Sequence, residues 1–476
     1  MDQLIKKSYF ISSLVVCGIL TAIKILSLYY TNIPLWVDEA QYWGWSKELA
    51  TGYFSKPPLI AWLIHNTTKI FGDSEFGIRV GAPLLHFFTA IFVFFIAASL
   101  TDKRTAFFSA VVYITLPAVA VSSSFISTDA PLIFFWAAAL YFLITFTRLK
   151  DKWHVLLIAY AISVGLGLLS KYTMAAFVLM SFYYIYSTRE GRGFFKMDFW
   201  IANIIAFLIF APNLYWNYNN HFISFVHTQE NVISGKSAGG LKFADMLEFI
   251  GGQIAVFGLA FIFYIFILLK KETYRNKVLV LFSAPLVLIG IIISLLSGAQ
   301  AHWAAAAYVT ASILVVEYIL RNNKLNWLKI IIISNLVIFL LCLDVKIPAS
   351  IASIKKDPLE RVTIWYKLEQ PLKIALADNP EAIIVSDERK IIATMMYALK
   401  DLKGNPKVIY KWNPQNITND HYSLTRSFKD ASEKPVLFIS RSDVSEGMSG
   451  IYFNIDRLKT ADEEFPFYLF LLKGRR

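Results

Sequence analysis

Long apolar runs alternate along the chain with polar connections, as in proteins that cross a membrane many times. A helical span needs about 20 apolar residues to cross a hydrocarbon core of about 30 Å. Windows of roughly that length predict eleven spans, near residues 9–30, 78–100, 105–122, 131–147, 154–170, 173–187, 199–215, 247–269, 278–296, 303–320 and 327–343. The pattern therefore predicts a multi-pass helical membrane protein.

One apolar run is too long to be a single span. Residues 155–187 would make about 50 Å of helix at 1.5 Å per residue, well beyond the thickness of the hydrocarbon core. The run must turn, and the polar Ser170, Lys171 and Tyr172 mark the place. We predict two helices that meet there.

The pattern changes after Leu343, where charged residues become frequent and apolar runs shorten. Three short runs are typical of buried strands, namely AIIVSD, KVIYKW and PVLFIS, and the first two are separated by an amphipathic helix, ERKIIATMMYALK. We predict two domains: a transmembrane domain over residues 1–344 and a small soluble α/β domain over residues 345–476.

Composition supports the membrane assignment, since 56% of the residues are hydrophobic and only 17% are charged. The net charge of +12 could indicate nucleic-acid binding, but of the Lys and Arg residues at the N-terminus and in the connections, 17 lie on one predicted side of the membrane and 6 on the other. Cytoplasmic loops are rich in Lys and Arg. The charge thus predicts a topology, with the N-terminus in the cytoplasm and the C-terminal domain outside, and it predicts no nucleic-acid partner.

Two connections on the predicted outer face are long, over residues 31–77 and 216–246. Long loops on a rigid scaffold are where functional residues concentrate. The first contains two amphipathic segments rich in Trp and Tyr, which we expect to be short helices lying in the membrane interface.

Most of the notable polar residues map to this outer face, at or near the ends of spans. They are Asp38, Glu39, Lys56, Arg79, Asp129, Lys171, His221, His227, Glu230 and His302. Single members have simpler explanations, such as helix capping for Asp38 or snorkelling for Lys56. Together they predict a site at the outer interface.

Cations and carboxylates at a membrane surface fit sugar transfer from a lipid phosphate. Lys and Arg would hold the donor phosphate and stabilise the charge that develops as it leaves. A carboxylate would serve as general base for an acceptor hydroxyl. No His, Cys or acidic spacing predicts a metal site, although a divalent metal remains an open alternative.

Six motifs in order, DEAQYW, GYFSKPPLIAWL, FGDSEFGIRV, STDAPL, GLGLLSKYT and AHW, resemble the bacterial branch of the protein O-mannosyltransferase superfamily. These GT-C glycosyltransferases include the aminoarabinose transferases that modify lipid A. The resemblance implies an inverting transferase in the cytoplasmic membrane. Its donor would be a sugar on a polyprenyl phosphate, commonly undecaprenyl phosphate, and its acceptor a lipid, glycan or protein of the cell envelope.

The resemblance also implies residue roles. Asp38 would be the catalytic carboxylate, with Glu39 as its partner and Asp129 as a second acidic residue of the site. The remaining roles are donor-phosphate binding by Lys56, Arg79 and Lys171, and pocket lining by Tyr53, His302 and Trp303.

The acceptor decides the task of Asp38, and the sequence leaves two acceptors open. With a phosphate acceptor, Asp38 would orient or bind an amino sugar, whereas with a hydroxyl acceptor it would be the base. One position departs from the aminoarabinose transferases, which typically have an acidic residue before the motif lysine. Here that residue is Ser55.

Two other classes of protein compete with an enzyme. A transporter or lipid flippase predicts repeated halves and broken helices near the midplane of the membrane, whereas the polar residues here lie at the outer ends. A non-catalytic scaffold would place the working part in the soluble domain, and it predicts that Asp38→Asn is harmless.

Overall fold

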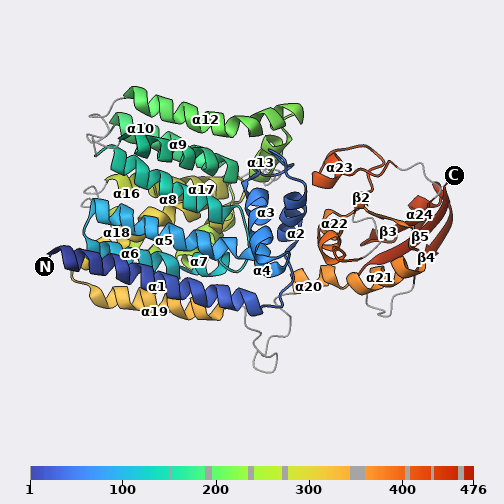
Figure 1. Ribbon diagram of the computed structural model, residues 1–476, viewed down its shortest axis with the longest axis horizontal. Helices are drawn as coiled ribbons and strands as arrows, with labels where there is room; N and C mark the ends of the chain where they lie inside the picture. Colours follow the sequence, from blue (N-terminus) through green and yellow to red (C-terminus); the bar gives the residue numbers. More distant parts are fainter. Residues whose placement is uncertain are drawn as a thin grey trace. The chain divides into compact units, whose positions relative to one another are not determined.

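The computed structural model shows a mostly helical chain with one small sheet (Figure 1). It describes residues 2–148, 153–187, 196–233, 241–270, 277–343, 360–402, 408–429, 434–458 and 466–475. The chain forms two compact units. The first comprises Met1–Thr31 and Lys56–Val345, and the second comprises Asn32–Ser55 and Lys346–Arg476.

The predicted boundary after residue 344 lies outside the described residues, as do residues 234–240 of the predicted outer loop 216–246. The second unit contains Asn32–Ser55, which the sequence predicted as part of the transmembrane domain. The predicted domain division therefore stays a prediction.

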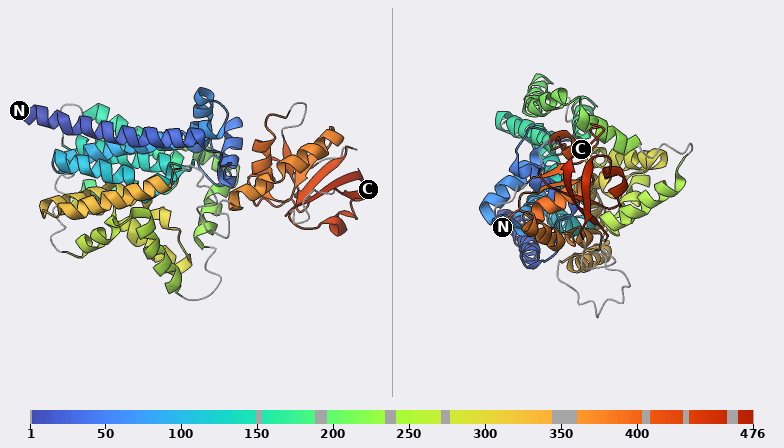
Figure 2. Two further views of the ribbon diagram at one scale, coloured as in Figure 1. Left: turned by 90° about the horizontal axis from the view of Figure 1, so that it is seen from below. Right: turned by 90° about the vertical axis from the view of Figure 1, so that its right-hand side faces the viewer.

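The first unit is built from helices that run mostly side by side (Figures 1 and 2). They are α1 (Asp2–Tyr30), α3 (Leu59–Phe71), α4 (Glu75–Arg79), α5 (Gly81–Leu100), α6 (Lys103–Thr115), α7 (Pro117–Ser122), α8 (Asp129–Phe146), α9 (Trp153–Ser170), α10 (Met174–Ser187), α12 (Lys196–Asn219), α13 (Ile223–Ile233), α14 (Phe243–Phe257), α15 (Ala260–Leu269), α16 (Lys277–Leu281), α17 (Ala284–Ser297), η3 (Ala301–Ala307), α18 (Tyr308–Arg321) and α19 (Leu325–Leu341).

Each predicted span falls on one of these helices or on a consecutive pair. Among the described residues, six helices are long and apolar enough to cross a membrane, or seven when one bent pair is included. Three shorter apolar helices accompany them, α9, α10 and α19. The exact number of crossings, eleven by sequence, stays a prediction.

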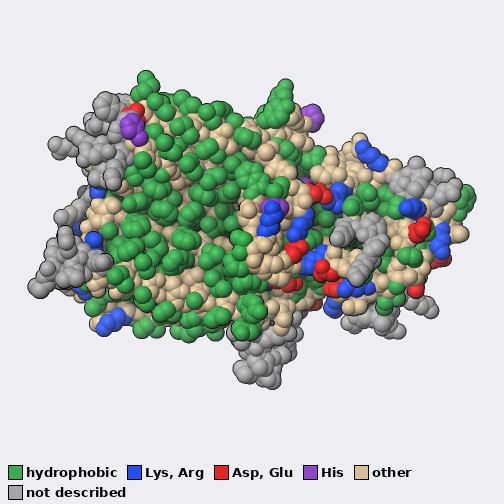
Figure 3. All heavy atoms as spheres, viewed as in Figure 1, with side chains coloured by type: hydrophobic (Ala, Val, Ile, Leu, Met, Phe, Trp, Pro, Cys, Tyr) green, Lys and Arg blue, Asp and Glu red, His purple; other side chains and the backbone are tan. Residues whose placement is uncertain are grey.

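The outward surface of this unit is apolar, as expected where lipid replaces water. Large exposed hydrophobic side chains recur along its helices, among them Val155, Leu179, Leu208 and Leu288. Figure 3 shows such side chains spread over the visible face of the helical unit. The apolar runs of the sequence thus supply both the packed interior and this lipid-facing surface.

The predicted turn in the long apolar run is confirmed. Helix α9 ends at Ser170 and α10 begins at Met174, and the amide of Lys171 still donates to the carbonyl of Gly167 at 3.1 Å. Lys171 therefore sits at the end of a helix, where its side chain can reach neighbouring elements.

Several predicted spans are divided between two helices, and two of these breaks have a clear local cause. Residues 247–269 form α14 and α15, which are bent by 118° where Gly258 adopts a φ of +66°. A Cβ there would lie 2.7 Å from Oδ1 of Asn335, so only glycine fits this position. Residues 105–122 break before Pro117, which has no amide hydrogen and forces Leu116 into an extended conformation.

The second unit contains the predicted α/β fold. Its five-stranded sheet has the order β2-β1-β3-β5-β4, in which β1 is parallel to β2 and β3, and β5 is antiparallel to β3 and β4. The elements are α2 (Val37–Lys47), α20 (Glu360–Tyr366), α21 (Glu369–Asp378), β1 (Ile383–Ser386), α22 (Arg389–Ala398), β2 (Ile409–Lys411), α23 (His421–Thr425), β3 (Val436–Ser440), α24 (Ser445–Met448), β4 (Tyr452–Arg457) and β5 (Tyr468–Arg475).

The three predicted strands and the helix between the first two are confirmed as β1, β2, β3 and α22. Strand β1 lies between its two parallel neighbours, β2 and β3, so the chain adds these two strands on opposite sides of β1. The carboxyl end of such a strand is where open α/β sheets commonly bind ligands. The segment from Ser386 to Arg389 follows β1 at this place.

Candidate active site

The first unit brings three of the predicted residues together. Nζ of Lys171 donates to Oδ1 of Asp129 at 2.6 Å, and Nε2 of His302 lies 3.8 Å from Oδ2 of the same carboxylate. Asp129 is the first residue of α8, Lys171 follows α9, and His302 is the second residue of η3. Three separate helix ends thus place these side chains at one point.

The charge of this cluster favours an anionic ligand. Lys56 acts electrostatically on both Asp129 and His302. With Lys171, it gives the cluster two cationic side chains for one carboxylate. The side chain of His302 is 47% exposed, so the cluster is open on that side. Lysines in such a position bind phosphate as point charges.

The η3 segment that carries His302 and Trp303 is held by buried polar contacts. Nε2 of Gln253 on α14 donates to the carbonyl of Ala301 at 3.2 Å, and the hydroxyl of Tyr308 donates to Oε1 of Gln253. The segment is therefore fixed in place. Pocket lining by His302 and Trp303 stays a prediction.

Arg79 and a histidine that the sequence analysis missed are both buried in the first unit. Arg79 ends α4 and is almost fully enclosed. His86 on α5 lies 3.1 Å from the hydroxyl of Tyr113 and 3.0 Å from Oγ of Ser122, and Asp129 acts on it electrostatically. An isolated histidine within an apolar run has no sequence pattern that indicates such a network.

Asp38, Glu39 and Tyr53 belong to the second unit. Asp38 lies in the first turn of α2 with its side chain 63% exposed. Its Oδ1 accepts a hydrogen bond of 3.2 Å from Nη1 of Arg389, and the same nitrogen donates to Oε1 of Gln41 at 2.6 Å. The predicted catalytic carboxylate is thus accessible and paired with an arginine.

Glu39 is oriented differently from its neighbour. It is buried, and its Oε2 accepts the amide hydrogen of Trp36 at 2.9 Å. This contact satisfies an amide at the start of α2. Glu39 therefore has a structural role in the helix that carries Asp38, while its catalytic role stays a prediction.

Tyr53 closes the turn that follows α2. Its ring stacks on Trp45 at 4.4 Å, and its hydroxyl lies within hydrogen-bond distance of the carbonyls of Trp45 and Glu48, at 3.0 and 3.1 Å. Burial raises the pKa of Tyr53 to about 12. The side chain is almost fully enclosed, so its predicted pocket-lining role stays a prediction.

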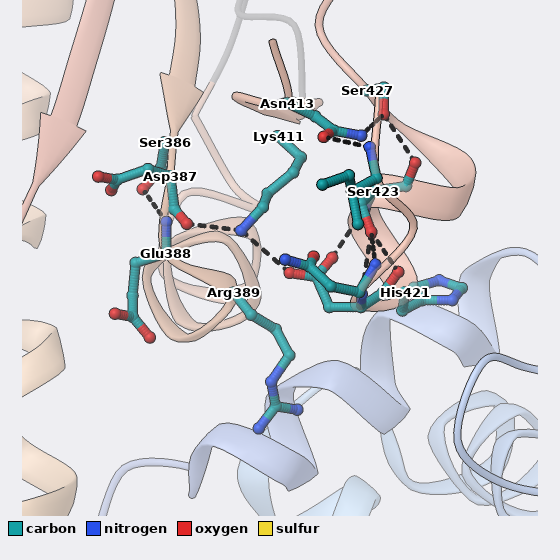
Figure 4. Close-up of polar contacts among 12 residues, drawn as sticks. Ser386, Asp387, Glu388, Arg389, Lys411, Asn413, His421, Ser423 and Ser427 are labelled. Atoms are coloured by element: carbon teal, nitrogen blue, oxygen red, sulfur yellow. Dashed lines mark hydrogen bonds and ion pairs between the residues drawn. The ribbon is translucent and has the colours of Figure 1, made fainter. Parts of the chain in front are cut away.

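The far end of α2 is held by α23 and the residue that follows it. Nη2 of Arg426 is ion-paired with Oε1 of Glu48, and the ring of His421 meets those of Trp45 and Tyr53 edge-on at 5.3 and 5.9 Å. Figure 4 shows His421 among the polar contacts of this part of the unit. The local sequence did not indicate these contacts.

His421 makes the stability of the protein depend on pH. Burial, together with the charges of Arg426 and Arg389, lowers the pKa of His421 from 6.5 to about 3. Between these pH values the unfolded chain binds a proton that the folded chain excludes, so stability falls as the pH decreases.

We expect the free energy of unfolding of the second unit to fall by roughly 2 kcal/mol between pH 7 and pH 5 because of His421 alone. In the His421→Gln variant this part of the loss is absent. The measurement is the thermal unfolding midpoint of the full chain across this pH range. An equally steep decline in the variant would assign the pH dependence to other groups.

Among the described residues, no group of three or more His, Cys, Asp or Glu side chains is placed to hold a metal ion.

Comparison with known proteins gives the class of the chain. A family described as dolichyl-phosphate-mannose-protein mannosyltransferase matches residues 55–216. The lipid A galacturonosyltransferase RgtD of Rhizobium johnstonii is 30% identical over 436 residues, which cover 90% of each chain. An undecaprenyl phosphate-alpha-4-amino-4-deoxy-L-arabinose arabinosyl transferase of Pseudomonas fluorescens is 31% identical over 29% of this chain and 28% of its own.

Solved structures share the fold. ArnT from Cupriavidus metallidurans bound to undecaprenyl phosphate has a TM-score of 0.69 at 13% identity, with 96% of this chain and 97% of ArnT covered. The archaeal oligosaccharyltransferase AglB from Archaeoglobus fulgidus has a TM-score of 0.53 at 13% identity, with 83% and 64% covered.

A bundle of apolar helices joined to a small α/β unit, with these relatives, defines a multi-pass membrane glycosyltransferase of the GT-C type. More specifically, the chain belongs to the superfamily of the protein O-mannosyltransferases and the lipid A glycosyltransferases. The predicted fold class and enzyme class are confirmed, and the transporter alternative is set aside.

Proposed function

We propose that this enzyme transfers a sugar from a polyprenyl phosphate to lipid A. The observation that carries the proposal is the cluster of Asp129, Lys171 and His302, to which Lys56 adds a second cationic side chain. A lipid phosphate needs such cations, both to be bound and to leave as an anion. The relative RgtD, which matches nine-tenths of the chain, is named as a lipid A transferase.

We further propose that the donor sugar is a uronic acid. RgtD and RgtB, another relative, are both named as galacturonosyltransferases, whereas the aminoarabinose relative matches less than a third of the chain. Ser55 agrees with this choice, because it supplies no negative charge for an amino sugar. A sugar with a carboxylate would favour cations instead.

The proposed roles follow from the charges. Lys56, Lys171 and Arg79 bind the donor phosphate, and Asp129 holds Lys171 at the 2.6 Å distance that fixes its ammonium group. Asp38 acts on the acceptor or on the sugar. It is the general base when the acceptor is a hydroxyl, and an orienting group when the acceptor is a phosphate that is already anionic.

We propose that transfer occurs on the outer face of the cytoplasmic membrane, with the N-terminus inside and the C-terminal residues outside. The distribution of Lys and Arg supports this orientation. We expect a reporter fused after Arg476 to be active outside the cytoplasm. A reporter that is active only in the cytoplasm would reverse the topology and remove the outer-face assignment.

Envelope mass spectrometry tests the proposed reaction in cells. Lipid A from cells with the protein should be heavier by one sugar residue than lipid A from matched cells without it. If lipid A is the same in both kinds of cell, and a glycan or protein fraction is lighter by one sugar in the cells without the protein, the acceptor is that glycan or protein. No change in any fraction would contradict the proposed function.

A further inference from the structure

One arginine in the second unit is only partly used by its neighbours. Nη1 of Arg389 makes both contacts to α2, at 3.2 Å to Asp38 and 2.6 Å to Gln41. Within the part of the chain that the structure describes, Nε and Nη2 of Arg389 have no hydrogen-bond partner, and the side chain is 32% exposed. Half of the guanidinium group is therefore available to a ligand.

Two other cations of this unit, Lys411 and Arg426, are ion-paired with carboxylates of the protein. Nζ of Lys411 lies 3.0 Å from Oδ2 of Asp420 and donates to the carbonyl of Asp387 at 2.5 Å, and the lysine is buried. Arg426 is ion-paired with Glu48, and its side chain is only 10% exposed. Of these three cations, Arg389 is the one that is partly exposed and contacts the predicted catalytic carboxylate.

The backbone that carries Arg389 is held by hydrogen bonds. Arg389 begins α22 directly after β1, and Oγ of Ser386 both accepts the amide hydrogen of Glu388 at 3.1 Å and donates to the carbonyl of Ile439 at 2.8 Å. Oγ of Ser440 donates to Oδ2 of Asp387 at 2.8 Å. In Figure 4 Arg389 extends away from this network, so its position is set before any ligand arrives.

The helix that presents Asp38 is fixed as well. Glu39 caps its start, and the contacts of Glu48 and Trp45 hold its end. Asp38 and Arg389 therefore form a preorganised pair in which the carboxylate charge is compensated. The positive charge of Arg389 balances the negative charge of Asp38. An oxyanion that approaches Asp38 is therefore not repelled and can contact Nε and Nη2 of Arg389.

A guanidinium group with two free nitrogens on one side matches an oxyanion, which it binds through two parallel hydrogen bonds. We propose that Nε and Nη2 of Arg389 bind an anionic group of a substrate at Asp38. Two sources share this chemistry: the carboxylate of an acidic donor sugar and a phosphate of lipid A. The proposal rests on the proposed function, because it takes Asp38 to act at the reacting groups.

The test compares substrates rather than activity alone. Purified full-length enzyme in nanodiscs is assayed with polyprenyl-phosphate galacturonate and with polyprenyl-phosphate galactose, which differ in the carboxylate. Each donor is assayed with two acceptors. One is intact lipid A, and the other is lipid A without the phosphate that does not receive the sugar. The enzymes are the wild type, Arg389→Gln, Arg389→Lys and a control, Arg441→Gln. Arg441 lies over the ring of Trp365, 5.4 Å from its centre, in the same unit.

If Arg389 binds the sugar carboxylate, Arg389→Gln lowers kcat/KM on the order of 10- to 100-fold with galacturonate and hardly changes it with galactose. If Arg389 binds a lipid A phosphate, Arg389→Gln lowers kcat/KM with the acceptor that carries this phosphate and not with the acceptor that lacks it, whichever donor is used. In both cases Arg389→Lys keeps part of the activity that Arg389→Gln loses, because lysine has the positive charge but not the two parallel N–H donors of arginine. Arg441→Gln behaves as the wild type.

Two results would overturn the proposal. One is no loss in Arg389→Gln, and the other is an equal loss with every donor and acceptor, which would assign Arg389 to the support of α2. A wild-type enzyme that transfers no sugar from either donor would reject the proposed function, and this proposal with it.

Discussion

Replacing Asp38 by asparagine is expected to abolish sugar transfer while the protein folds and inserts normally. The asparagine keeps the size of the side chain and can still accept a hydrogen bond from Arg389, whose contact with Gln41 is unaffected. It removes the charge and the ability to accept a proton. When the acceptor is a hydroxyl and Asp38 is its general base, the loss is expected to be about 10²- to 10⁴-fold in rate. The measurement is kcat/KM of the purified variant with a polyprenyl-phosphate donor.

Glu48→Gln provides a matched control, since Glu48 also pairs with an arginine of the same unit but lies at the other end of α2. We expect this variant to retain transfer. Wild-type turnover in Asp38→Asn would remove the catalytic assignment. Equal inactivity in Glu48→Gln would show that transfer depends on the placement of α2 rather than on Asp38.

The second large effect is expected at the pair of Lys171 and Asp129. Both side chains are mostly enclosed, and their 2.6 Å contact joins the end of α9 to the start of α8. Lys171→Met leaves the carboxylate without this partner, which costs about 3 kcal/mol for an enclosed pair. Transfer is also expected to be lost, because a cation for the donor phosphate is gone.

A double variant separates these two effects. In Lys171→Met with Asp129→Leu both charges of the pair are removed together, so thermal unfolding is expected to return towards the wild-type midpoint. Activity is expected to stay absent. A double variant that transfers sugar would exclude this pair from the reaction, and single variants as stable as the wild type would show that the contact contributes little.

Much of the fold follows from local pattern. Apolar runs located the helices of the first unit, and the excess length of one run located the turn at Lys171. Three apolar segments located the parallel strands of the second unit. Such features are set by the length and composition of a few adjacent residues, and these are visible in the sequence.

What could not be predicted depends on distant contacts. Residues 32–55 belong to the same unit as residues beyond 345, and no local pattern records a contact across such a separation. At the bend, Gly258 lies against Asn335, which is on another helix, and this close approach has no local sequence pattern. Glu39 caps α2 by accepting the amide hydrogen of Trp36, but the N-cap residue is Trp rather than the Ser or Thr of the usual capping-box sequence, so the sequence did not indicate this contact.

The candidate site divides in the same way. The grouping of Asp129, Lys171 and His302 was predictable because each lies at the same predicted ends of spans. Arg389 was not predicted, although its place directly after a parallel strand is a recognised position for ligand contacts. Its pairing with Asp38, 351 residues away along the chain, appears only in the folded unit.

Transfer by the purified enzyme tests the central claim most directly. Full-length protein in nanodiscs is mixed with polyprenyl-phosphate galacturonate and lipid A, and both lipids are followed by mass spectrometry. We predict that lipid A gains one sugar residue as free polyprenyl phosphate appears in equal amount. A donor that stays intact beside unmodified lipid A, under conditions in which the protein is folded, would contradict the account.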